Sequence, residues 1–419
     1  MSENTFTSGN RRHKMARGFL LAVSLLSLLT GGCWDDRELN ELGIVSGSAY
    51  DWKDNQWLAT YQVINPSSGS NNTGGSGGGS SSSPPFLTYA VTGSTIMQAV
   101  ERTNLTSTRQ LFFSHSRITV IGESLAKRGI SQLIDLFLRK PDARETVYVF
   151  IAKGEAGRIL SQLMQLTKNQ GAGIQLMIEQ EARLTSYYPG IQMFELAMQL
   201  TSESASAAVP EIMLSGGKVM DRTDDIAQTD LPSRIKFGRL AVLKGDRFVG
   251  WLSQHEAYGL SFMTDKIQKA NISFPSIPEK GDKDDASFTL LHSSTAVRPV
   301  WEKDHFVMDI DIEASGTLTE LGSNLKLEED STVRKLENSI AHNILEIVQT
   351  SWGSVQKLNA DVTGFAVAIH RHYPQRWKRI EREHSWDTVF QNIEIRPHAK
   401  VKITRIGLNS NSYNSLDKK

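Results

Sequence analysis

The pattern of apolar and polar positions is clearest in the last third of the chain. Apolar and polar side chains alternate from residue 306 to residue 313, which predicts a half-buried strand. A long helix is predicted next, with one apolar face made by Val333, Leu336, Ile340, Ile344, Ile347 and Val348. Further strands are predicted at 364–369 and 393–403. Since each of these elements has one apolar face to bury, we expect a helix packed on an antiparallel sheet.

Strands and helices are predicted to alternate in the first half of the chain. The predicted strands are 57–64, 86–91, 118–121 and 146–152. Thr95 and Gln98 form a capping-box pattern that opens a short helix through Val100. Apolar residues from Ile130 to Leu138 recur at helical spacing and predict a second helix. This order favours an α/β or α+β first domain that ends near residue 200.

A middle segment begins near Pro210. Residues 234–243 and 247–251 are predicted to be two strands, joined by a turn at Lys244-Gly245-Asp246. Charged residues from 279 to 285 predict a linker before the last segment. Residues 67–83 contain only Ser, Gly, Asn and Thr, a composition typical of a flexible loop.

These patterns predict the fold class α+β (mixed α/β), with three consecutive domains of mixed sheets and packed helices after a signal peptide. The predicted boundaries are 1–32 for a lipoprotein signal peptide, 33–200 for an N-terminal α/β domain that carries the Ser/Gly-rich loop 67–83, 201–278 for a middle β-rich domain, 279–409 for a C-terminal α+β domain and 410–419 for a disordered tail. A chain of 419 residues is long enough for two or three domains.

The N-terminus has the order of a secretory signal. A basic stretch from Arg11 to Arg17 precedes an apolar stretch from Phe19 to Leu29, and Thr30-Gly31-Gly32-Cys33 follows. The apolar stretch is shorter than the ~20 residues of a membrane-spanning helix. A cysteine directly after two glycines resembles a bacterial lipobox, in which the thiol accepts a diacylglycerol, although Thr30 stands where that pattern prefers Leu. We predict lipidation of Cys33, with acyl chains that hold the protein stably at a bilayer. The alternative is an ordinary signal peptide with a coincidental cysteine.

Composition narrows the classes of function. Lys and Arg together number 46, as do Asp and Glu, and beyond residue 32 the chain carries 42 basic and 45 acidic residues. This mildly acidic balance gives no reason to expect a nucleic-acid partner, because such proteins usually carry a basic excess. Cys33 is the only cysteine, which excludes an intrachain disulfide and a Cys-rich zinc site.

Candidate metal and cofactor chemistry is weak. The sequence has no Walker A motif and no GxGxxG, so no cofactor is predicted. His370 and His372 alternate next to a predicted strand, and with His384 they resemble a metal site. No cysteine or tightly spaced acid completes that set, so solvated or hydrogen-bonded histidines are the favoured interpretation.

Other chemistry-bearing residues also favour structural roles. His115 could act as a general base, but no nearby nucleophile or carboxylate in the sequence would orient it. Asp221, Asp224 and Asp225 suggest calcium, yet the spacing of an EF-hand is missing and a solvated turn is favoured. We expect core or interface positions for the tryptophans Trp34, Trp251, Trp301, Trp377 and Trp386. The sequence therefore predicts no catalytic or metal-ligating residue and a protein that is not an enzyme.

The run from Gly32 to Val45, Gly-Cys-Trp-Asp-Asp-Arg-Glu-Leu-Asn-Glu-Leu-Gly-Ile-Val, closely resembles the mature start of the Ger(x)C family. Members of this family are the lipoprotein C subunits of spore nutrient germinant receptors. The segments that resemble the family further along are 95–100, 113–115, 250–252, Glu256, 259–260, 361–365, 373–377 and Trp386. The departures are the Ser/Gly segment 67–83, Thr30, and Ala366 where the family commonly has Gly.

The resemblance implies a non-enzymatic receptor subunit of three mixed α/β domains, tethered by Cys33 to the outer face of the spore inner membrane. It also implies assembly with two membrane subunits, A and B, of which B mainly holds the germinant pocket. The sequence agrees, because it shows no convergent polar constellation of the kind that binds a small ligand. Two alternatives stay open: a lipid-anchored solute-binding protein of an uptake system, and a surface hydrolase of peptidoglycan that uses His115.

Overall fold

The computed structural model describes residues 19–20, 39–66, 84–276, 285–323 and 325–405. The chain divides into two units, Met1–Leu42 with Thr108–Gln110, and Gly43–Ser107 with Leu111–Lys419. In the first unit, Leu39–Glu41 form the 3-10 helix η1. The elements below belong to the second unit, apart from the first residue of β1 and the first residue of β4.

The first sheet is mixed, with parallel strands at its centre. Its strands are β1 (Leu42–Lys53), β2 (Gln56–Ile64), β3 (Phe86–Gly93), β5 (Ile118–Gly122), β6 (Tyr148–Ala152), β7 (Ser206–Leu214), β8 (Ile235–Lys244) and β9 (Arg247–Leu252), and β4 is the short strand Gln110–Phe112. The strands follow the order β3-β2-β1-β5-β6-β7-β8-β9. β1, β5, β6 and β7 run parallel, and antiparallel hairpins flank them on both sides. The strands predicted at 57–64, 86–91, 118–121 and 146–152 and the hairpin at Lys244-Gly245-Asp246 are confirmed.

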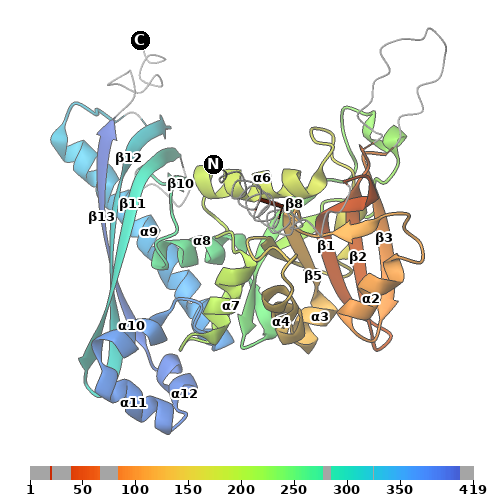
Figure 1. Ribbon diagram of the computed structural model, residues 1–419. Helices are drawn as coiled ribbons and strands as arrows, with labels where there is room; N and C mark the ends of the chain where they lie inside the picture. The colour runs from red at the N-terminus through yellow and green to blue at the C-terminus, as the bar shows by residue number, and fades with distance from the viewer. Residues whose placement is uncertain (1–18, 21–38, 67–83, 277–284, 324, 406–419) are drawn as a thin grey trace, which may run out of the picture. The chain divides into compact units, whose positions relative to one another are not determined.

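Helices cover both faces of the first sheet (Figure 1). One face packs against α2 (Ile96–Thr103), α3 (Glu123–Arg128), α4 (Ser131–Arg139) and α7 (Met193–Thr201). The other packs against α5 (Gly157–Ser161), α6 (Gln170–Leu184) and α8 (Gln254–Met263). In β6, Phe150 belongs to one hydrophobic cluster and its neighbours Val149 and Ile151 belong to the other. A strand buried on both faces in this way loses the alternation of apolar and polar residues.

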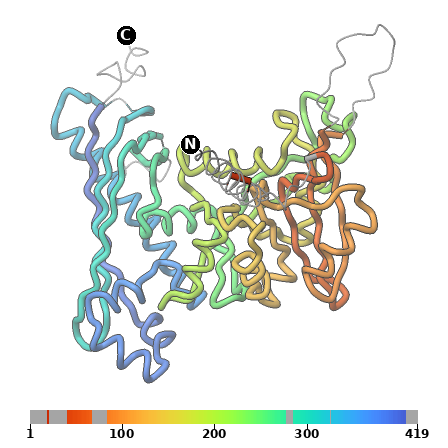
Figure 2. Tube along the Cα trace, viewed as in Figure 1, coloured from red at the N-terminus to blue at the C-terminus, as the bar shows by residue number. Residues whose placement is uncertain are grey.

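The second sheet has the order β10 (Ala270–Phe274), β11 (Ala286–Glu302), β12 (His305–Leu321) and β13 (Glu394–Arg405). Figure 2 follows these strands from the green-cyan to the blue part of the trace. The strands predicted at 306–313 and 393–403 are confirmed. The prediction of a wholly antiparallel sheet is wrong, because β13 runs parallel to β12. Parallel neighbours need a long crossover, and here α9 (Asp330–Leu358), α10 (Phe365–His372), α11 (Pro374–Arg382) and α12 (Trp386–Gln391) supply it.

The predicted strand at 364–369 is wrong, because this segment forms α10. The carboxylate of Asp361 accepts hydrogen bonds from the backbone N–H groups of Phe365 (3.0 Å) and Ala366 (2.8 Å), which caps the first turn. Gly364 has a φ of +77°, a left-handed conformation that favours glycine. A short apolar run is compatible with a buried strand or a helix, and here the cap decides for the helix.

One hydrophobic cluster extends from the first sheet through α8 and α9 to the second sheet. β7, β8 and β9 continue the first sheet, whereas β10 begins the second, so residues 206–274 contribute to both sheets. The division into three domains stays a prediction. The predicted signal peptide apart from Phe19 and Leu20, the loop 67–83 and the tail 410–419 lie outside the described residues, as does nearly all of the predicted linker.

Candidate functional site

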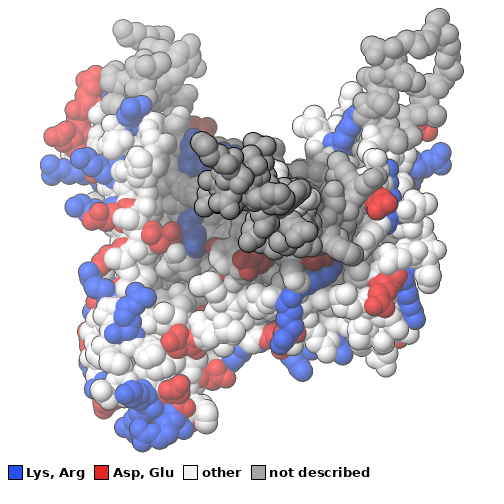
Figure 3. Space-filling model, in the orientation of Figure 1, with Lys and Arg blue, Asp and Glu red and all other residues white. Residues whose placement is uncertain are grey.

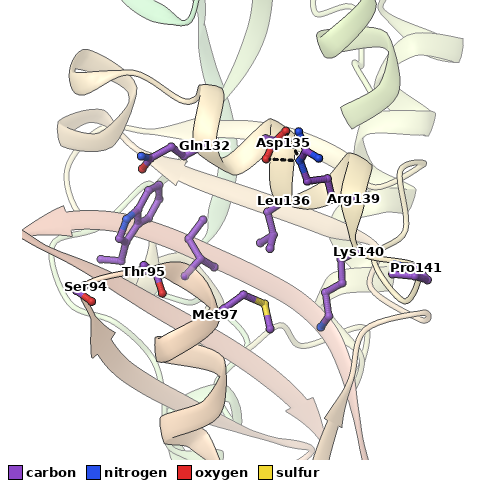
Figure 4. Close-up of a pocket in the computed structure, with 11 residues that line it drawn as sticks. Ser94, Thr95, Met97, Gln132, Asp135, Leu136, Arg139, Lys140 and Pro141 are labelled. Carbon is purple, nitrogen blue, oxygen red and sulfur yellow. Dashed lines mark hydrogen bonds and ion pairs between the residues drawn. The ribbon is translucent and has the colours of Figure 1, made fainter.

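A groove of about 510 Å³ lies between α2 and α4. Its apolar lining comes from Trp57 of β2, Ile96 and Met97 of α2, and Leu136 of α4. Figure 4 shows Met97 and Leu136 facing one another between the two helices. Met97 is 42% exposed although it belongs to a helix that covers the sheet. The groove therefore presents apolar surface to the outside.

The charged side chains at the groove are already paired. On α4, Asp135 accepts two hydrogen bonds of 2.7 Å from the guanidinium of Arg139. The ammonium group of Lys140 lies 4.2 Å from the ring centroid of Phe113 and 3.6 Å from Asp142. The lining residues include no His and no Cys. The groove therefore combines exposed apolar side chains with charged side chains that already have partners.

Of the three histidines considered as a metal site, His370 and His372 do not share a face as expected, and both make hydrogen-bond contacts. His370 and His372 lie two residues apart on the helix α10, so they do not share a face as they would on a strand. His370 Nδ1 lies 2.7 Å from a Glu203 carboxylate oxygen, and its ring stacks on Trp377 at 5.6 Å. His372 Nδ1 lies 2.9 Å from the carbonyl oxygen of Ala368. The described residues contain no group of three His, Cys, Asp or Glu that could hold a metal ion.

The remaining candidates lie on the surface. His115 is exposed, and its ring centroid lies 5.7 Å from that of Phe112. Asp224 and Asp225 belong to the 3-10 helix η3 (Thr223–Ile226), where a side-chain oxygen of Asp225 accepts a hydrogen bond from the Arg222 backbone N–H. This is local turn geometry and needs no bound cation.

The tryptophans that the structure describes pack against other side chains. Trp377 is 5% exposed, and its ring lies 5.4 Å from that of Trp386. Arginine guanidinium groups lie 4.2 Å above Trp251 and 3.9 Å above Trp301. These are packing contacts of the kind expected for core and interface residues. Trp34 lies outside the described residues.

The raised pKa values of two groups in β1 have burial as their largest cause. Burial raises the pKa of the Tyr50 hydroxyl to about 12. Burial also raises the pKa of the Asp51 carboxyl, although this carboxylate accepts hydrogen bonds from the N–H groups of Ala156 (2.9 Å) and Gly157 (3.2 Å). Both side chains are 2% exposed. Their shifts therefore reflect core packing, not an accessible acid–base site.

Asp361 joins α10 to the loop after α7. Besides capping α10, its carboxylate accepts hydrogen bonds of 2.7 Å from the hydroxyl groups of Ser204 and Thr363. Asp361 is 2% exposed. One buried carboxylate thus satisfies four donors and holds together two segments 157 residues apart in the sequence. This contact is a physical reason for residues 361–365 to have the sequence that resembles the family.

The segment 250–260, parts of which resemble the family, includes the part of α8 that packs against α9. Ser253 and Glu256 form a capping box at the start of α8, and the Glu256 carboxylate also accepts a hydrogen bond from Ser354 of α9. A Cβ on Gly259 would lie 2.5 Å from the carbonyl oxygen of Ile347 and 2.5 Å from the Cβ of Ser351. Glycine is therefore required for the two helices to approach this closely.

The Glu203–His370 contact predicts a pH-dependent contribution to stability. The hydrogen bond with His370 holds the pKa of the Glu203 carboxyl below its usual value of 4.5. A depressed folded-state pKa stabilises the fold above the usual pKa, and this contribution disappears as the pH falls through the folded value. Because the side chain is 34% exposed, we expect Glu203→Gln to lower the free energy of unfolding at pH 6 by only about 0.5 kcal/mol.

Urea unfolding at several pH values checks this expectation. The difference between Glu203→Gln and the unaltered protein should shrink as the pH falls below 4.5. Glu381→Gln, at an exposed position on α11, serves as the control and should change stability little. A Glu203→Gln difference that stays constant down to acidic pH would contradict the assigned cause.

Cys33, the predicted lipidation site, lies outside the described residues. Within the part of the chain that the structure describes, we find no helix whose length and apolar character would let it span a bilayer. Basic and acidic side chains are interspersed over the described residues on the face shown in Figure 3.

Comparison with known proteins identifies the class. Residues 35–214 match the spore germination protein N-terminal domain, and residues 238–407 match the spore germination B3/GerAC-like C-terminal domain. The chain therefore belongs to the Ger(x)C family of spore germination proteins, and the family predicted from its sequence is confirmed.

Individual relatives are similar over nearly their whole length. The chain is 26% identical to spore germination protein KC of Bacillus subtilis (strain 168), over 95% of this chain and 98% of that protein. It is 23% identical to spore germination protein B3 of the same organism, over 94% of this chain and 99% of that protein. The crystal structure of the GerBC protein has a TM-score of 0.52 at 18% identity and covers 88% of this chain and 100% of that one. This last likeness supports the α+β fold.

Proposed function

We propose that the protein is the lipid-anchored C subunit of a spore nutrient germinant receptor. The observation that carries the proposal is the family match across residues 35–214 and 238–407, which begins two residues after the lipobox-like Cys33. In this function the mature chain starts at a diacylglyceryl Cys33 on the outer face of the spore inner membrane. Two acyl chains on one residue provide stable anchoring where a single chain does not.

The folded body acts by binding, not by catalysis. Its partners are the A and B membrane subunits of the receptor, and its role is assembly of the receptor for nutrient-triggered germination. The apolar groove between α2 and α4 supports this role, because its charges are paired and its lining is mostly apolar. A groove of this kind suits an apolar side chain on a partner protein.

Deletion of the gene tests the proposal. Spores without the protein should lose germination in response to the nutrient that this receptor detects, while germination by a stimulus that bypasses nutrient receptors is kept. The strain must lack other receptors for the same nutrient. Normal nutrient germination in such a strain would contradict the proposed function.

The anchor makes a separate prediction. Cys33→Ser removes the thiol that accepts the diacylglycerol, so the protein should move from the membrane fraction to the aqueous fraction of spore extracts. The control is the double variant Cys33→Ser with Ser116→Cys. It still contains one thiol, but at a buried position of the described body instead of at residue 33. Full membrane retention of the Cys33→Ser protein would show that the lipid is not what holds it.

The groove also favours one alternative, a lipid-anchored solute-binding protein. Its volume of about 510 Å³ falls in the range of small-ligand sites. Thermal-shift measurements of the body with amino acids and sugars separate the two functions, because a ligand at ~100 times its Kd adds ~2.7 kcal/mol of stability. A selective shift that disappears in Met97→Asp would favour the solute-binding protein.

A further inference from the structure

The start of β1 is where the chain leaves the lipid tether and enters the folded body. Leu42, the first residue of β1, follows Cys33 by nine residues, a length that spans at most about 32 Å. A lipid on Cys33, the proposed anchor on which this inference rests, therefore keeps the start of β1 close to a bilayer. At this end of the sheet Val45 of β1 pairs with Val63 of β2, and Val63 pairs with Leu87 of β3. This end of the three strands is termed the leading edge.

The loop 162–169, between α5 and α6, is fixed to the leading edge at both of its ends. Before the loop, the carbonyl oxygen of Leu160 accepts a hydrogen bond of 2.6 Å from the side-chain amide of Gln62 in β2. After the loop, α6 packs so closely on β1 that a Cβ on Gly171 would overlap the carbonyl oxygen of Ser46. The loop therefore projects from the same part of the body that the tether enters.

Leu166, in the middle of this loop, is fully exposed, at 101% of its reference surface. It is five residues from Gly171, so it lies within about 18 Å of the leading edge. Leu87, on the leading edge itself, is 44% exposed. Single exposed leucines are ordinary on protein surfaces. Two of them beside the attachment point of a lipid tether are within reach of the boundary between headgroups and acyl chains.

Charges near the loop favour an apolar contact over an electrostatic one. Lys168 is exposed, but the loop also bonds to a nearby acidic turn. The side-chain amide of Gln165 donates to the carbonyl oxygen of Ile226 at 3.3 Å. The turn 221–225, next to Ile226, holds three aspartates and one arginine. Because both signs of charge are present, attraction to anionic lipids should contribute little to membrane binding beyond what burial of the leucine side chains contributes.

We propose that the loop 162–169 is the membrane contact of the folded body, and that Leu166 and Leu87 enter the headgroup region of the bilayer that anchors Cys33. This contact orients the body with its leading edge toward the lipid. The opposite end of the β1–β2 hairpin, where Lys53 pairs with Gln56, lies about 26 Å from the leading edge, since β1 extends eight residues beyond Val45. In this orientation that end points away from the lipid.

Site-directed fluorescence on the full lipidated chain tests the inference. Cys33 is the only cysteine, and its sulfur is blocked once lipidated, so an introduced cysteine is the one thiol that a dye can label. Leu166→Cys and Leu87→Cys carry a polarity-sensitive nitrobenzoxadiazole dye. Gln56→Cys, at the opposite end of the hairpin, and Met198→Cys, an apolar residue 65% exposed on α7, are the matched controls.

Each labelled protein is reconstituted on phosphatidylcholine vesicles with and without anionic phosphatidylglycerol. Dyes at 166 and 87 should show blue-shifted emission, quenching by nitroxide lipids and loss of quenching by aqueous iodide, on both kinds of vesicle. Dyes at 56 and 198 should be quenched by iodide alone.

Iodide quenching of the dye at 166 on vesicle-bound protein would overturn the inference, as would lipid quenching at 56 or 198. Lipid quenching that requires phosphatidylglycerol would overturn the apolar contact, and shielding from both quenchers would indicate a protein neighbour instead. If the chain fails to bind vesicles and its Cys33 reacts with the dye, the proposed lipid anchor is contradicted. This outcome distinguishes a failure of the proposed anchor from a failure of the proposed loop contact.

Discussion

Replacing Gly259 with valine is expected to lower the free energy of unfolding by about 3 kcal/mol or more. At this position α8 meets α9 so closely that even a Cβ would lie 2.5 Å from the backbone carbonyl oxygen of Ile347. The backbone of a 29-residue helix cannot relieve the overlap by a rotamer change as a side chain can, so the helices must separate. Their separation opens the hydrophobic cluster that continues from the first sheet to the second.

Chemical denaturation followed by far-ultraviolet circular dichroism measures this loss. Gly353→Ala is the matched control, because Gly353 lies in α9 with no atom within 4 Å of an added Cβ. An exposed glycine inside a helix costs about 0.5–1 kcal/mol relative to alanine, so this control should stabilise the protein. A Gly259→Val protein as stable as the unaltered one would refute the close crossing of α8 and α9.

Asp361→Ala is expected to cost about 3 kcal/mol, because it leaves four hydrogen-bond donors without their acceptor. Two of the donors are the backbone N–H groups that start α10, and the hydroxyl of Ser204 belongs to the loop after α7. The loss of the cap alone costs about 1–2 kcal/mol. The remaining loss comes from burying polar groups that no longer have a partner.

Two milder variants separate the parts of this effect. Ser204→Ala removes only the bond between the distant segments and should cost about 1 kcal/mol. Asp361→Asn keeps one acceptor oxygen and should fall between Ser204→Ala and Asp361→Ala. Equal stability of all three variants would mean that the Asp361 carboxylate does not hold these segments together.

Elements with a single buried face could be predicted from the sequence. The alternation that begins at Phe306 and the helical stripe from Val333 to Val348 both correspond to elements that the structure contains. β1 was not predicted, because its Ser, Gly and Ala positions are buried on both faces and give no alternation. β11 was missed because much of it is Ser, Thr and His.

The misassigned α10 and the direction of β13 have different physical causes. The apolar run at 365–369 has no periodicity of its own, and its helical state depends on the cap from Asp361. The direction of β13 depends on how four helices return the chain across the sheet, which a local pattern does not encode.

The family could be predicted from the sequence, whereas the groove and the Asp361 contact could not. The groove combines Trp57, residues 94–97 and residues 132–141, which tertiary packing alone brings together. For Asp361 a local signal existed, since an Asp shortly before the apolar run, in Asp361-Val362-Thr363-Gly364-Phe365, is a plausible start of a helix. Its bond to Ser204 spans 157 residues and has no counterpart in the local sequence.

The most direct test of the central claim, a body held at a bilayer by one lipidated residue, is mass spectrometry of the N-terminal peptide of the mature protein from spore membranes. If Cys33 is lipidated, the mature chain begins at residue 33 and Cys33 carries the mass of a diacylglyceryl thioether. A chain that still begins upstream of Cys33, or a free thiol at that position, would contradict this claim.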